Sequence, residues 1–126
     1  LIDAATFASR TLGFVNAPAL IQRIVARIQH ASVDIGVYRR KRDFLYRELT
    51  RIGYEMVKPQ GAFYMFPRSP LPDDRVFVAL LQTKLVLVVP GAGFGTPGYF
   101  RLSYCVDDHT LEGSIPGFEA AWRETH

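Results

Sequence analysis

The chain has 126 residues and a formal net charge of +3 at pH 7, with 48% hydrophobic and 21% charged residues. This length and balance predict one globular domain with its own core, and they exclude a disordered or low-complexity chain. The sequence shows no signal-peptide pattern and no apolar run of membrane-spanning length, so we expect a cytoplasmic protein with no membrane partner.

The first half of the sequence has the periodicity of helices. Residues 1–10 fit one helix, residues 11–16 read as a break, and Pro18 predicts the first turn of a second helix, where its missing N–H is not needed. A longer helix is predicted for residues 35–52, and Gly53 is well placed to end it. The apolar face of the second helix consists of Leu20, Ile21, Ile24, Val25 and Ile28.

The second half mixes strand and helix patterns. Asp73 and Asp74 open a further helix, where acids favour the helix dipole. A last helix begins at Asp107 or Asp108, and we expect Gly113, Pro116 and Gly117 to interrupt it. Strands are predicted for residues 54–57, 62–66, 85–89 and 99–104. From the second helix on, the order α-α-β-β-α-β-β-α predicts a small sheet covered by helices, in the α+β or α/β class.

Other composition signals point to few special sites. Arg39 to Arg42 form the one dense basic cluster, and it lies in a helical pattern, so we read it as a solvated helix face without a nucleic-acid partner. The single Cys105 follows a predicted strand and is expected to be a buried small side chain. The three histidines, His30, His109 and His126, have no metal-ligand spacing, so we expect no metal site.

The stretch from Val89 to Tyr104, VPGAGFGTPGYFRLSY, contains four glycines and two prolines. Its Gly93-x-Gly95-x-x-Gly98 spacing matches the dinucleotide fingerprint, but that motif requires a helix after the loop, and a strand pattern follows here. A glycine-rich loop of the kinase type is also excluded, because no lysine follows Lys84.

Arg101 lies inside the apolar strand that follows this loop. A guanidinium among apolar side chains needs a compensating charge. Two partners are open at this point: an acid of the chain in a structural ion pair, or a ligand carboxylate held by two parallel hydrogen bonds.

Four motifs in register carry a resemblance to a known family: LGFVNAPA (Leu12 to Ala19), PQGAFYMFP (Pro59 to Pro67), VPGAGFG (Val89 to Gly95) and GYFRLSY (Gly98 to Tyr104). Together they resemble the C-terminal part of class I/II aminotransferases, the fold type I enzymes that use pyridoxal phosphate. The resemblance covers roughly residues 12–122 and implies a small C-terminal domain at residues 31–126. Residues 1–30 would be the end of the large cofactor-binding domain and a linking helix.

The resemblance implies transfer of an amino group between an amino acid and a 2-oxo acid, in a homodimeric enzyme. It also implies that Arg101 binds the substrate α-carboxylate and that Gly61 lies where the main chain comes close to the substrate. The cofactor would be pyridoxal 5'-phosphate, but Lys41, Lys58 and Lys84 do not lie in the family's lysine-attachment motif.

The missing lysine motif leaves two functional hypotheses. In the first, the chain is part of an aminotransferase and is inactive without the large domain. In the second, it is a non-enzymatic module of aminotransferase type that binds a carboxylated ligand or a protein partner.

Overall fold

The computed structural model describes residues 1–13 and 17–126, which form two units, residues 1–33 and 34–126. The first unit contains helices α1 (Ile2–Thr11) and α2 (Ala19–Arg27), and Pro18 is the residue directly before α2. Both predicted helices are therefore confirmed. The predicted break at residues 11–16 and the motif at Leu12 to Ala19 lie partly outside the described residues.

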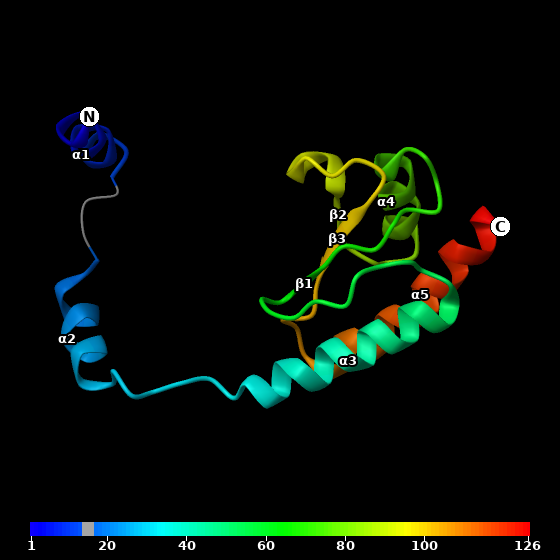
Figure 1. The fold of residues 1–126 in the computed structure, drawn as a ribbon, viewed down its shortest axis with the longest axis horizontal. Helices are drawn as coiled ribbons and strands as arrows, with labels where there is room; N and C mark the ends of the chain where they lie inside the picture. The colour runs from blue at the N-terminus through cyan, green and yellow to red at the C-terminus, as the bar shows by residue number, and fades with distance from the viewer. Residues whose placement is uncertain (14–16) are drawn as a thin grey trace. The chain divides into compact units, whose positions relative to one another are not determined.

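The second unit contains a three-stranded antiparallel sheet and three α-helices (Figure 1). The central strand β3 pairs on one side with β1, where Tyr64 lies opposite Ser103, and on the other with β2, where Val89 lies opposite Arg101. In chain order the elements are α3 (Ile35–Ile52), β1 (Tyr64–Met65), α4 (Asp74–Thr83), β2 (Val89–Pro90), the 3-10 helix η1 (Gly91–Phe94), β3 (Phe100–Ser103) and α5 (Asp108–Thr125). The predicted small sheet with helices, an α+β fold, is confirmed.

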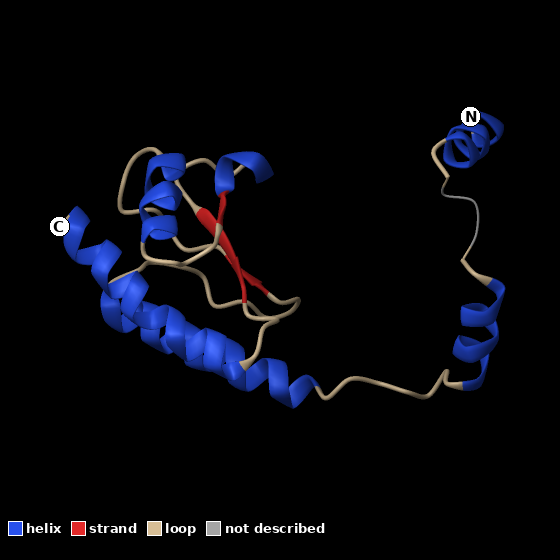
Figure 2. Ribbon diagram, turned by 180° about the vertical axis from the view of Figure 1, so that it is seen from behind, coloured by secondary structure: helices blue, strands red, loops and turns tan. Residues whose placement is uncertain are grey.

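Helices α3 and α5 lie side by side, and both views of the fold show the sheet packed on one side of this pair (Figure 2). The core between sheet and helices is aromatic. The Tyr54 ring lies within 6.1 Å of four other rings, measured between centroids, and its hydroxyl donates to the Phe118 carbonyl oxygen at 3.0 Å. The four rings belong to Phe77, Phe100, Phe118 and Trp122.

Two predicted strands are corrected by the structure. Residues 54–57 form no strand, because the Tyr54 N–H donates to the Leu49 carbonyl and so completes the end of α3. Of residues 85–89, only Val89 belongs to a strand. Leu85 has a positive φ of 61° and is 92% exposed, whereas Val86 is buried, so this run is an irregular segment with alternating burial.

The predicted interruption of the last helix is also wrong, because α5 runs without a break through Pro116. Gly117 has a packing role instead. A Cβ at this position would lie 2.5 Å from the Val86 Cγ2 and 3.0 Å from the Lys84 carbonyl oxygen, so the glycine lets the helix pack closely on that segment. Tertiary packing therefore outweighs the low helix propensity of these residues.

Asp107 is confirmed as the residue that caps α5. Its carboxylate accepts hydrogen bonds from the Thr110 N–H at 2.7 Å and from the Thr110 hydroxyl at 2.8 Å. These bonds hold the pKa of Asp107 below its usual value of 3.8. A carboxylate with a lowered pKa stabilises the fold above its ordinary pKa, and this contribution is lost as pH falls through the lowered value.

We therefore expect Asp107→Ala to lower the melting temperature at pH 7 and to have a clearly smaller effect at pH 2. Thermal unfolding followed by circular dichroism at both pH values would check this. Asp108→Ala is the control with a smaller expected effect, since it removes a neighbouring exposed acid and its ion pair with Lys41 but leaves the bonds that Asp107 accepts from Thr110. An equal loss at both pH values would contradict a role for the charged cap.

Two surface expectations are also revised. Cys105 is exposed, with its thiol 4.0 Å from the Tyr38 hydroxyl, so the prediction of a buried cysteine is wrong. The basic cluster is divided: Arg39 and Arg40 are exposed, while Lys41 and Arg42 are largely covered and pair with Asp108 and Asp43. The prediction of a solvated helix face therefore holds for Arg39 and Arg40 but not for Lys41 and Arg42.

Candidate functional site

The side chains of strand β3 alternate between a buried face of the sheet and a more open one. Phe100 and Leu102 are buried, as is Tyr104 directly after the strand, whereas Arg101 and Ser103 alternate with them and are half-buried. On the neighbouring strand β1, Met65 is buried and Tyr64 is exposed opposite Ser103. Arg101 and Tyr64 therefore lie on the open face of the sheet, away from the core.

The Arg101 guanidinium lies over two aromatic rings. Its central carbon is 4.3 Å from the centroid of the Tyr64 ring and 3.8 Å from that of the Phe94 ring. Ring faces attract a cation, so these contacts stabilise the charge without using the N–H groups at the edge of the guanidinium. Among residues 1–13 and 17–126, no carboxylate lies within ion-pair distance of Arg101.

The sequence left two partners open for Arg101, an acid of the chain or a ligand carboxylate, and this geometry favours the second. The described residues provide no structural ion pair for Arg101, and its edge N–H groups have the fork shape that matches a carboxylate. The arrangement can therefore bind a carboxylate brought by a ligand. The sequence analysis did not identify the two rings. Neighbouring side chains of a strand point to opposite faces, so a core position for Met65 could have indicated that Tyr64 lies on the open face with Arg101.

Gly61 lies in an exposed bend just before β1, where a Cβ would meet no atom within 4 Å. The chain beside it is tied to the end of β3, because the Tyr104 hydroxyl donates to the Ala62 carbonyl at 2.7 Å. Gly61 is thus attached to the segment three residues beyond Arg101. The space around it is open, as a close approach by a ligand requires, and its role stays a prediction.

The glycine loop forms the short 3-10 helix η1 and returns to the sheet as β3. No helix leaves the loop toward a phosphate, in agreement with the rejection of a dinucleotide site. Gly91 is the tightest point. A Cβ there would lie 2.6 Å from the Tyr99 carbonyl oxygen and would also overlap the Thr96 carbonyl.

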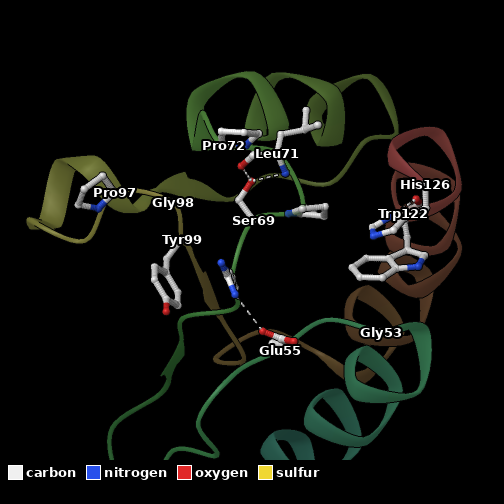
Figure 3. Close-up of a pocket in the computed structure, with 12 residues that line it drawn as sticks. Gly53, Glu55, Ser69, Leu71, Pro72, Pro97, Gly98, Tyr99, Trp122 and His126 are labelled. Atoms are coloured by element: carbon white, nitrogen blue, oxygen red, sulfur yellow. Dashed lines mark hydrogen bonds and ion pairs between the residues drawn. The ribbon is translucent and has the colours of Figure 1, made fainter.

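A pocket of about 730 Å³ lies elsewhere in the second unit, and Arg101 is not among its lining residues (Figure 3). Its wall includes Trp122, whose ring stacks on His126 at 3.9 Å, and Ser69, whose hydroxyl bonds to the Leu71 carbonyl. The arginine of this wall, Arg68, is already paired with Glu55 at 3.4 Å. The carboxylate-binding geometry therefore lies on the open sheet face and not in this pocket.

Within residues 1–13 and 17–126, no group of three or more histidine, cysteine or acidic side chains comes together as a metal site would require. Over the same residues, every helix is too short or too polar to cross a membrane.

A comparison with known protein families decides the affiliation of the chain. The family described as aminotransferase class I and II matches residues 5–115. The chain belongs to this family.

Relatives among characterised proteins are similar to parts of this chain. A probable aspartate/prephenate aminotransferase of Aquifex aeolicus is 38% identical over 96 residues, which are 71% of this chain and 24% of that protein. An aspartate/prephenate aminotransferase of Thermus thermophilus is 42% identical over 84 residues, covering 64% of this chain and 22% of that protein. The chain thus spans about a quarter of the length of these relatives.

Solved structures agree with the fold. An aminotransferase from Eubacterium rectale superposes with a TM-score of 0.84 at 44% identity, over 94% of this chain and 30% of that one. The Thermus thermophilus aspartate aminotransferase with maleate gives a TM-score of 0.65 at 36% identity, over 67% of this chain and 22% of that one. The aminotransferase family resemblance is confirmed, and the α+β unit has the fold of part of a fold type I aminotransferase.

The family implies dependence on pyridoxal phosphate in the complete enzymes. The residues of this chain do not fit attachment of that cofactor. Lys41 donates to the Val106 carbonyl and pairs with Asp108, Lys58 pairs with Asp43 at 2.8 Å, and Lys84 pairs with Glu124. All three lysines of the sequence are thus engaged within the chain, and none contacts the Arg101 cluster of Tyr64, Phe94 and Arg101.

Proposed function

We propose that the chain is the C-terminal part of a pyridoxal-phosphate-dependent aminotransferase that moves an amino group between an amino acid and a 2-oxo acid. Residues 31–126 form the small domain in this proposal, and residues 1–30 form the end of the large domain with a linking helix. The complete enzyme is a homodimer in the cytoplasm, and the chain alone is inactive. Neither nucleic acid nor membrane is a partner in this proposal.

The position of Arg101 carries this proposal. Its guanidinium is stacked on two rings, it has no acidic partner among the described residues, and it lies on the open face of the sheet. Amino acids and 2-oxo acids share an α-carboxylate, and a bidentate arginine binds that group in a fixed orientation. Holding a substrate in one orientation lowers the barrier of the following step, so the contribution of this chain is substrate binding and alignment.

Pyridoxal phosphate supplies the electron sink in such enzymes, and the large domain would hold it. The engaged lysines support this division of labour. The same observation favours the second hypothesis, a module that binds carboxylates without catalysis, if no large domain accompanies the chain.

Parallel assays of the complete cofactor-loaded protein and of the 126-residue chain would separate these hypotheses. We expect the complete protein to transfer amino groups from amino acids to 2-oxoglutarate and the chain alone to show no turnover. Calorimetric titration of the chain with amino and 2-oxo acids belongs to the same test. If the chain binds these acids but the complete protein shows no turnover, the hypothesis of a non-enzymatic module is correct and that of an aminotransferase is wrong.

A further inference from the structure

Two rings from different parts of the chain determine where the Arg101 guanidinium lies. Tyr64 comes from β1, which is hydrogen-bonded to β3 and therefore moves with Arg101. Phe94 is different, because it lies at the end of η1, outside the sheet, and makes the closer contact of the two at 3.8 Å. The placement of η1 therefore decides whether Arg101 keeps this contact.

A buried carboxylate anchors η1. The Asp74 side chain is in the first turn of α4, is only 3% exposed, and accepts a hydrogen bond from the Ala92 N–H at 2.8 Å. On the other side of the turn, the Gly91 N–H donates to the Tyr99 carbonyl at 2.8 Å. These bonds hold η1 between α4 and the start of β3.

The Phe94 ring has a second support besides its own turn. Its centroid is 6.1 Å from that of Phe66, with the two ring planes at 88°, an edge-to-face arrangement that aromatic pairs favour. Phe94 is nevertheless 43% exposed, so burial alone does not explain why a large apolar side chain lies here. The exposed ring is in contact with the Arg101 guanidinium, whose central carbon lies 3.8 Å from the ring centroid.

We propose that Phe94 is a positioning residue for Arg101 and that Asp74, through Ala92, holds Phe94 in place; this inference rests on the proposed function of Arg101. A long, unpaired arginine samples many rotamers and loses that freedom when a carboxylate binds. Stacking on Phe94 removes part of this freedom beforehand and leaves the edge N–H groups free for the ligand. Asp74 thus contributes to substrate binding without touching the substrate.

The test uses the complete cofactor-loaded enzyme with two readouts, steady-state kinetics and calorimetric titration with maleate, which reports binding without turnover. We expect Phe94→Ala to raise both the KM for the amino acid and the Kd for maleate about fivefold to tenfold, with a smaller change in kcat. Phe94→Tyr keeps the ring face and should restore both constants.

Two further comparisons separate positioning from general damage to the fold. Tyr46→Ala removes a ring from a similar contact, since Lys58 lies 5.4 Å above Tyr46, and it should leave KM and Kd unchanged. Asp74→Asn keeps an oxygen that accepts from Ala92, whereas Asp74→Ala does not. We expect the alanine variant to raise the Kd for maleate as Phe94→Ala does, and the asparagine variant to stay close to the parent enzyme.

The outcome for Arg101 distinguishes failure of this inference from failure of the proposed function. If Arg101→Ala raises KM but Phe94→Ala changes neither constant, the inference is overturned and the proposed function stands. If Arg101→Ala itself has no effect, the proposed function fails as well. In a background of Arg101→Ala, Phe94→Ala should change neither KM nor Kd any further. If it still raises these constants as much as in the parent enzyme, Phe94 contacts the substrate directly and the inference is overturned.

Discussion

Replacing Arg101 with alanine in the complete enzyme is expected to raise the KM for the amino acid about a hundredfold, because two charge-assisted hydrogen bonds to the α-carboxylate are lost. The large effect follows from the surroundings of Arg101: Tyr64 and Phe94 offer ring faces but no second cation for the carboxylate. Because binding at this point also orients the substrate, kcat should fall too. Steady-state kinetics with several amino acids would measure both constants.

The matched control is Arg68→Ala. Arg68 is bridged to the sheet opposite Tyr99, but it is exposed and its guanidinium already bonds to Glu55, so its loss should change KM by less than twofold. Arg101→Lys should fall between the parent enzyme and the alanine variant, because lysine keeps the charge but loses the fork and the stacking surface. An unchanged KM for Arg101→Ala would remove Arg101 from the carboxylate site.

The helices were predictable because their signals are local. Residues 35–52 have the helical period, and Gly53, which adopts a positive φ of 127°, ends the helix as expected. Asp73 and Asp107 cap their helices by accepting hydrogen bonds from N–H groups two or three residues later. Such signals need no knowledge of the rest of the chain, so they can be read from sequence.

The errors arose where distant segments decide the structure. The glycines of α5 looked like a helix break, but Gly117 faces Val86, thirty-one positions earlier in the sequence, at a distance only a glycine allows. The apolar run from Leu85 to Val89 looked like a buried strand, yet only its last residue pairs with β3. In both places tertiary packing outweighs local propensity.

The candidate site also has a part that the sequence could predict and a part that it could not. Arg101 could be identified because a charge within an apolar strand is conspicuous in any sequence. The parts that surround it could not, since Tyr64, Phe94 and Asp74 meet Arg101 or its loop only after the sheet has formed. Asp74 in particular has the sequence signature of an ordinary first-turn acid, and only the structure shows its bond to Ala92.

Gly91→Ala is expected to destabilise the fold by about 3 kcal/mol, because the new methyl group would overlap the backbone carbonyls of Thr96 and Tyr99. Backbone atoms cannot rotate away as a side chain can, so η1 would have to move from β3. That movement would also carry Phe94 away from Arg101. Urea unfolding measures the first effect, and maleate titration of the complete enzyme measures the second.

Gly93→Ala provides the control within the same turn. A Cβ at Gly93 would meet no atom within 4 Å, and its φ is not positive, so the change should alter stability by less than about 0.5 kcal/mol. Two glycines of one 3-10 turn are thus expected to differ sharply, because only Gly91 lies against the carbonyls at the start of β3. Equal losses for both variants would mean that the loop needs glycine for flexibility, and that its close packing on β3 does not determine the position of Arg101.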